Sequence, residues 1–82
     1  MAEAVSDGLS GADLTESMLA GAELCGADLR GTIFERACLR GVRLEGADLT
    51  GAVLTGADTT GAKTAGAAGL PEDLPQVESA CD

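Results

Sequence analysis

The chain has 82 residues and an acidic composition, with 14 Asp and Glu against five Lys and Arg and a formal net charge of -9. Phe34 is its single aromatic residue, and it contains no histidine. These counts argue against a conventional layered core and against a nucleic-acid surface built on base stacking. They also remove imidazole, the commonest general acid-base group, from any catalytic scheme.

The first segment, residues 1–10, reads "MAEAVSDGLS". It lacks the basic start and apolar centre of a secretory signal peptide. No apolar run in the chain approaches the ~20 residues that a membrane span requires. We therefore expect a short N-terminal cap or tail at residues 1–10 of a cytoplasmic protein that makes no membrane contact.

Residues 11–70 form a repeat of five residues. A leucine, replaced once by Phe34, recurs at every fifth position from Leu9 to Leu54, with a small residue two positions earlier and a glycine at most steps. A five-residue step scatters leucines around an α-helix, and collagen needs glycine at every third position. In extended segments the small and the large residue share one side, and one bend per repeat at glycine closes the chain into a polygon of stacked coils.

The segments "ADLTG", "AELCG", "ADLRG" and "AVLTG" resemble the motif A-(D/N)-L-x-x of the pentapeptide repeat family. The resemblance implies an all-β fold, a right-handed quadrilateral parallel β-helix over residues 11–70. It implies four pentapeptides per coil and about three coils, so that residues twenty apart stack. Since only the middle coil has a neighbour on both sides, we expect Leu29, Phe34, Leu39 and Leu44 to be the most buried side chains.

Residues 71–82 are predicted to form a C-terminal cap and an acidic tail. Pro71 and Pro75 prevent a long helix in this segment. The exposed strand edges of the last coil need a cover, and apolar residues of the tail suit that role. These residues are Leu70, Leu74 and Val77.

The three cysteines, Cys25, Cys38 and Cys81, are odd in number and share no metal-ligand spacing. We expect ordinary small residues or free thiols in a reducing compartment, with no disulfide framework. No base stands beside a cysteine to activate it, and the glycines form no phosphate-binding loop. The sequence therefore predicts a protein that is not an enzyme and that uses no cofactor or metal.

Binding is the function class that remains. Stacking by twenty places Glu16 over Arg36 and groups three arginines on successive steps, either as solubilising charge or as a patch for an acidic partner. It also stacks the outward apolar residues Ile33 and Val53 under Asp13 as a short stripe. The acids Asp28 and Asp48 stack on one face in the same way. The candidate partner surface comprises Arg36, Arg40, Arg43, Ile33, Val53, Asp28 and Asp48.

Some members of the family resemble B-form DNA and inhibit or protect DNA gyrase, so the resemblance also implies a gyrase-directed DNA mimic. However, residues 11–70 hold eight acids against five bases. Three coils at ~4.8 Å make a rod of ~14 Å, against ~34 Å for one turn of DNA. The prediction is a protein-protein interaction or scaffold module, with the gyrase-directed mimic as the alternative and no direct nucleic acid binding.

The predicted partner is another protein, which the sequence does not identify. Three coils bury little apolar area, and domains below roughly 70 to 80 residues commonly need a staple or an oligomer. We therefore also expect a homodimer, formed through a coil end or through the face that carries Ile33 and Val53.

Overall fold

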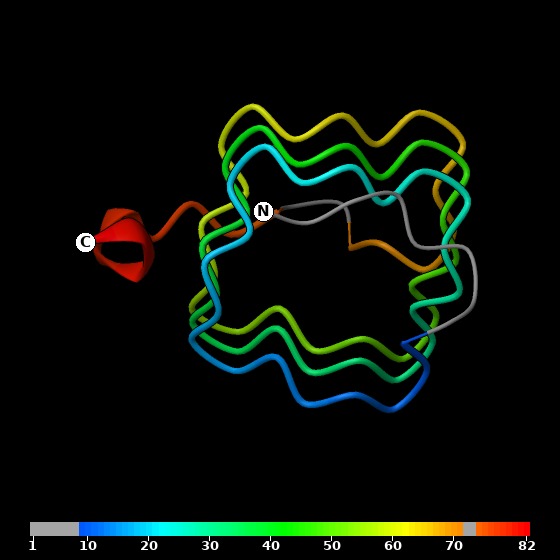
Figure 1. The fold of residues 1–82 in the computed structure, drawn as a ribbon, viewed down its shortest axis with the longest axis horizontal. Helices are drawn as coiled ribbons and strands as arrows, with labels where there is room; N and C mark the ends of the chain where they lie inside the picture. The colour runs from blue at the N-terminus through cyan, green and yellow to red at the C-terminus, as the bar shows by residue number, and fades with distance from the viewer. Residues whose placement is uncertain (1–8, 72–73) are drawn as a thin grey trace.

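The computed structural model describes residues 9–71 and 74–82. Figure 1 shows a chain that winds repeatedly around one axis and has a nearly square outline. Parallel β-bridges join residues twenty apart, as from Asp13 to Ile33 and from Ile33 to Val53. Each coil therefore contains four pentapeptides, as the family resemblance implied. Each bridge stands alone between two turns, so no continuous strand forms among the described residues.

The bridged residues form four columns, and each column defines one side of the coil. We number these sides in chain order. Face 1 carries Asp13, Ile33 and Val53; face 2 carries Met18, Cys38 and Asp58; face 3 carries Glu23, Arg43 and Lys63; and face 4 carries Asp28, Asp48 and Ala68.

Each corner of the coil is a tight turn, and most of these turns have glycine at the third position. The N–H of Ala12 donates to the carbonyl of Leu9 at 2.8 Å, and Gly11 between them has a φ of 76°. A type II turn needs a positive φ at this position, which glycine adopts without steric cost. The glycine period in the sequence is therefore the period of the corners.

The aspartates of the repeat stabilise the turn that follows them. The Asp48 carboxylate accepts hydrogen bonds from the backbone N–H of Thr50 at 3.0 Å and from its hydroxyl at 2.6 Å. Asp13 binds Thr15 in the same way. Such side-chain to backbone bonds are typical of Asx turns. The acidic position of the motif thus has a local structural role.

The core consists of large and small apolar side chains that stack along the inside of the coils. Leu29 and Phe34 are fully buried and Leu39 and Leu44 nearly so, but Leu49, outside the predicted four, is also fully buried, so the prediction that these four are the most buried holds only in part. The buried set extends into both neighbouring coils, where it includes Leu24 and Leu49. No buried side-chain nitrogen or oxygen atom of the described residues lacks a hydrogen-bond partner.

The repeat ends at Gly69, which has a φ of 82°. A Cβ atom on this residue would lie 2.4 Å from the backbone nitrogen of Thr50. Only glycine lets the chain pass so close to the coil above. Leu70 and Leu74 then pack against the core, as predicted.

Residues 74–77 attach to the open end of the last coil. Gln76 forms an antiparallel bridge with Asp58, Thr59 donates its N–H and its hydroxyl to the Pro75 carbonyl at 2.9 and 2.7 Å, and the Val77 N–H donates to Ala57 at 3.1 Å. Val77 thus covers the strand edge of the last coil through its backbone, while its side chain is 39% exposed. The chain leaves the coil at this point.

The last element is the 3-10 helix η1, Glu78–Cys81, which lies outside the square outline of the coil (Figure 1). No helix in the described part of the chain is long and apolar enough to cross a membrane. The predicted N-terminal cap falls largely on residues 1–8, and two acids of the predicted tail, Glu72 and Asp73, are at positions 72–73; all of these lie outside the described residues.

Candidate functional site: a cleft beside the C-terminal helix

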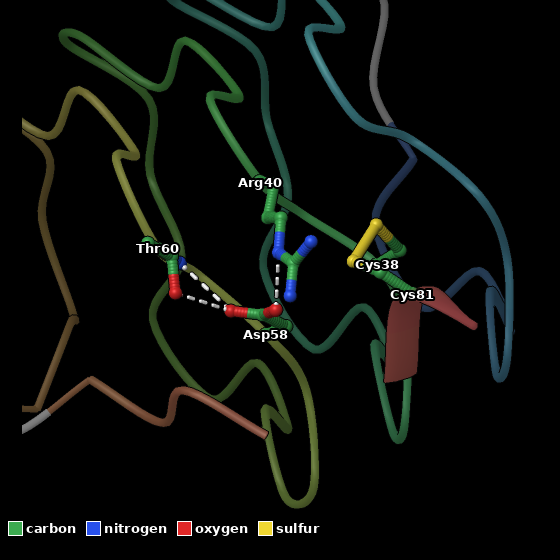
Figure 2. Close-up of a disulfide and its surroundings, with 5 residues drawn as sticks. All are labelled: Cys38, Arg40, Asp58, Thr60 and Cys81. Atoms are coloured by element: carbon green, nitrogen blue, oxygen red, sulfur yellow. Dashed lines mark hydrogen bonds and ion pairs between the residues drawn. A yellow bond between two sulfur atoms is a disulfide. The ribbon is translucent and has the colours of Figure 1, made fainter. Parts of the chain in front are cut away.

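A disulfide bond joins Cys38 on face 2 to Cys81 at the end of η1 (Figure 2). The expectation of free thiols is therefore wrong for these two residues, whereas Cys25 is free and exposed. The two bonded cysteines are 43 positions apart in the sequence, and their Cα atoms lie 4.7 Å apart. The tail has no repeat from which its path could be predicted, and that path is what brings Cys81 onto face 2.

Asp58, the next residue down the face 2 column, is completely buried. Figure 2 shows its carboxylate between Thr60 and Arg40. Thr60 donates its N–H at 3.0 Å and its hydroxyl at 2.6 Å to one oxygen, and Arg40 Nε donates to the other at 2.6 Å. The hydrogen bonds from Thr60 and the one from Arg40 hold the pKa of Asp58 below its ordinary value. The buried charge is therefore satisfied within the fold.

The corner between faces 1 and 2 departs from the repeat twice. Glu16 and Arg36 occupy the glycine position there, with φ values of 62° and 56°, and they are the only non-glycine residues with positive φ in the part of the chain that the structure describes. Arg36 Nε lies 3.3 Å from Glu16 Oε2, so the two residues that stacking by twenty brings together form an ion pair. Gly56 completes the column, and a Cβ atom there would lie 3.0 Å from Arg36 Cγ. The arginine stem thus lies over the glycine.

This corner and the C-terminal segment enclose a cleft of about 380 Å³. Two of its residues, Met18 and Val77, belong to the three large apolar side chains that are exposed among the described residues; the third is Val53 on face 1. The cleft therefore has apolar surface beside a charged corner. Its lining residues are Glu16, Met18, Arg36, Gly56, Val77, Ser79, Ala80 and Asp82.

The three arginines of the predicted surface lie at two successive corners and on face 3, and each is paired with an acid. Arg36 binds Glu16, Arg40 binds the buried Asp58, and Arg43 Nε lies 3.4 Å from Glu45. They are consecutive in the repeat, as expected. They do not form an unpaired basic patch, and only Arg36 lines the cleft.

The other predicted surface residues do not line the cleft. Ile33 and Val53 stack on face 1, half-buried and exposed respectively. Asp28 and Asp48 stack on face 4, where hydrogen bonds from Arg30 and from Thr50 respectively lower their pKa values. A general acid needs a raised carboxyl pKa, so these two carboxylates are not poised for that role.

Other reactive or ligating groups form no second candidate site in the part of the chain that the structure describes. The pKa of the free Cys25 thiol is raised, chiefly by its hydrogen bond to Glu45 at 3.3 Å, which disfavours the nucleophilic thiolate. Among residues 9–71 and 74–82, no three His, Cys, Asp or Glu side chains are grouped to hold a metal ion.

The sequence reasoning missed Met18, Val77 and Cys81 as residues of one site. One signal was present, because the stacking by twenty already put Met18, Cys38 and Asp58 in one column. A large apolar residue and a cysteine at outward positions of the same face suggest that something covers that face. The C-terminal tail, which has no repeat, was an available cover.

The family model for pentapeptide repeats matches residues 9–46 and 42–63 with eight copies. The chain therefore belongs to the pentapeptide repeat family, and this membership implies that its coil is a right-handed β-helix. A solved pentapeptide repeat protein from the thylakoid lumen of Arabidopsis thaliana is similar to it, with 34% sequence identity and a TM-score of 0.71. The likeness covers 88% of this chain and 49% of that one, so the chain spans about half the length of this relative. No curated protein sequence matches the chain.

Proposed function

We propose that the protein is a non-enzymatic interaction module that docks a segment of another protein in the cleft between η1 and the corner formed by Glu16 and Arg36. The observation that carries the proposal is the backbone of this corner, where two non-glycine residues adopt positive φ values of 62° and 56°. Both side chains line the cleft.

Stability does not account for these two residues. A left-handed conformation costs a non-glycine residue roughly 1–2 kcal/mol. An exposed ion pair returns only about 0–1 kcal/mol, and the Arg36 and Glu16 side chains are 55% and 68% exposed. Glycine, which occupies the same position at Gly56 in the next coil, avoids the strain altogether. Local backbone strain that the fold does not need supports a functional role for the side chains that cause it.

The chemistry of the cleft favours a partner segment with an apolar side chain next to a basic one. Met18 and Val77 offer apolar surface. The charge of Arg36 is already met by Glu16, and Asp82 adds a further acid to the lining. The whole chain is also acidic, at -9, which favours approach of a basic partner. The hypothesis of an acidic partner for Arg36, Arg40 and Arg43 is replaced, because all three are paired.

Titration of the oxidised, ¹⁵N-labelled protein with a synthetic pentapeptide of alternating arginine and leucine tests this proposal. We expect amide shifts at the cleft residues and none along face 3. The same peptide with glutamate in place of arginine should not bind. Shifts confined to faces away from the cleft, or equal binding of both peptides, would contradict the proposal.

A matched pair of substitutions locates the binding energy. Val77 and Val53 are equally exposed, at 39% and 38%, but only Val77 lines the cleft. Only a minority of interface residues cost more than about 1 kcal/mol of binding when truncated, and these cluster near the centre of the interface. We therefore expect Val77→Ala to weaken peptide binding by roughly 5- to 10-fold and Val53→Ala to leave it unchanged. Equal losses would show that the contact is not specific to the cleft.

A gyrase-directed DNA mimic is the alternative function, and the dimensions of one molecule weigh against it. Its extents are 29 × 27 × 22 Å, with the coil axis along the shortest of them (Figure 1). One turn of DNA measures about 34 Å. We expect no inhibition or protection in a gyrase supercoiling assay, and a clear effect there would favour the mimic over the docking module.

A further inference from the structure

We propose that the Cys38–Cys81 disulfide is a redox-controlled strap. Its reduction by a dithiol releases η1 and opens the cleft, while the coils stay folded. The release itself follows from the contacts of η1; the effect on docking rests on the function proposed above.

The disulfide is the only bond between η1 and the coils in the part of the chain that the structure describes. The hydrogen bonds of η1 are internal, from Ala80 N–H to Val77 at 2.9 Å and from Asp82 N–H to Ser79 at 3.2 Å. None of its residues is buried, and its N-cap residue, Val77, makes no side-chain capping bond. A single 3-10 turn of four residues is not stable by itself in water. Among the described residues, no hydrogen bond would therefore hold η1 on the coils once the disulfide is broken.

The segment just before η1 has independent anchors. Pro75 accepts two hydrogen bonds from Thr59, and the Val77 N–H donates to Ala57. Gln76 bridges Asp58 between them. Release should therefore stop at Val77 and free only residues 78–82, which leaves the cover over the end of the last coil intact.

Release of these residues removes one wall of the cleft. Ser79, Ala80 and Asp82 belong to the freed segment, whereas Glu16, Met18 and Arg36 stay on the coil. The remaining surface is a flat corner with an exposed methionine, and it no longer encloses a partner side chain. Reduction should therefore weaken docking.

The exchange begins at Cys81, because Cys81 is half-buried and Cys38 is only 2% exposed. A thiolate of the dithiol attacks Cys81 Sγ, a mixed disulfide forms, the Cys38–Cys81 bond breaks, and Cys38 leaves as a thiolate that takes up a proton. The second thiol of the dithiol attacks the mixed disulfide and releases Cys81. Two electrons and two protons pass to the protein, and the dithiol becomes a disulfide.

NMR spectra of the ¹⁵N-labelled full chain, before and after addition of excess dithiothreitol, test the release without any partner. We expect the amide signals of residues 78–82 to narrow and move to random-coil positions, while those of residues 9–71 keep their dispersion. Unchanged signals for residues 78–82 would overturn the strap. Collapse of the coil signals would overturn it as well, since the disulfide would then support the whole fold.

Two variants serve as controls. Cys81→Ser should show the released spectrum with or without dithiothreitol. Cys25→Ser keeps the strap and should respond to the reductant as the parent does. If Cys81→Ser kept the ordered spectrum of the oxidised parent, the disulfide would not be what holds η1, and the proposal would fail.

The coupling to docking is measured with the arginine-leucine peptide in both redox states. We expect at least a 10-fold weaker affinity after reduction, and the same weak affinity for Cys81→Ser. If the oxidised protein does not bind the peptide, the proposed function fails although the release of η1 stands on its spectra. If binding is equal in both states while η1 is released, the redox control of docking is wrong and the proposed function stands.

Discussion

The coils and the C-terminal segment of residues 74–82 hold their shape by different means. Along the coils, backbone bonds and inward side chains, most of them leucines, repeat with the pentapeptide, so that contacts of the middle coil are supported by equivalent contacts above and below. The C-terminal segment has one bridge at Gln76, the bonds of Pro75 and Val77, and one disulfide. Regions with few buried contacts open locally at low free energy, while a continuous core opens only with global unfolding. We therefore expect the coils to be rigid and the C-terminal segment beside the cleft to open locally.

The largest effect should come from the core of the middle coil. Phe34→Ala removes a fully buried ring that has a coil on either side, and we expect a loss of about 3–5 kcal/mol in the free energy of unfolding. Val77→Ala, in the C-terminal segment, should change it by less than about 0.5 kcal/mol. Urea denaturation of the oxidised proteins measures both. Similar values for the two variants would remove the contrast between the regions.

The next effect tests the junction between the two regions. Gly69→Ala adds the left-handed strain of any non-glycine residue and also drives a Cβ atom against the backbone of Thr50. Gly11→Ala adds the strain alone, because nothing lies within 4 Å of its Cβ position. We expect a loss of roughly 3 kcal/mol or more for Gly69→Ala and about 1–2 kcal/mol for Gly11→Ala, by urea denaturation. Equal losses would mean that the junction relaxes.

Acid should act on the buried carboxylate beneath the C-terminal segment. Because Thr60 and Arg40 hold the pKa of Asp58 below its ordinary value of 3.8, the unfolded chain binds this proton more readily than the folded one. Its contribution to stability is therefore complete above about pH 5 and is lost as the pH falls through the folded pKa.

Asp58→Asn should consequently remove part of the acid sensitivity, measured as urea midpoints over this pH range. Asp48→Asn on face 4 is the comparison, since Asp48 also has a lowered pKa but no hydrogen bond from an arginine. It should remove a smaller part. A steeper pH dependence in Asp58→Asn than in the parent would contradict the assignment.

The smallest effect on stability is expected at the strained corner. Arg36→Gly removes the strain of a non-glycine residue at positive φ, which stabilises the fold, and loses an exposed ion pair, which destabilises it by a similar amount. The free energy of unfolding should stay within about 0.5 kcal/mol of the parent. Peptide affinity should fall, because the cleft loses a lining side chain. A large loss of stability with unchanged affinity would assign Arg36 to the fold and not to docking.

Most of the fold could be predicted from the sequence, because the repeat gives every coil the same inward, outward and corner positions. The inward register of Phe34 and the pairing of Glu16 with Arg36 both follow once residues twenty apart are stacked. The number four per coil came from the family motif, since spacing alone shows only that the polygon closes.

The cleft could not be predicted, because it depends on the path of twelve residues without a period. Thr59 illustrates the difficulty, since in the repeat it only replaces a leucine and weakens the core. In the structure its N–H and hydroxyl bind Pro75 and set where the tail lies. A polar residue at a core position was the sequence feature that marked the attachment point, and the disulfide followed from that attachment.

The position of Cys38 among the coils decides at which end the β-helix could be lengthened without breaking the disulfide. It lies one coil above the bridge between Asp58 and Gln76. Duplication of twenty residues before residue 31 would add a coil above Cys38 and leave its distance to Cys81 unchanged. The same duplication after residue 50 would raise Cys38 by one layer, about 4.8 Å, into the place relative to the tail that Met18 now holds. Lengthening by repeat duplication is thus compatible with the crosslink at the N-terminal end of the coil and breaks its register at the C-terminal end.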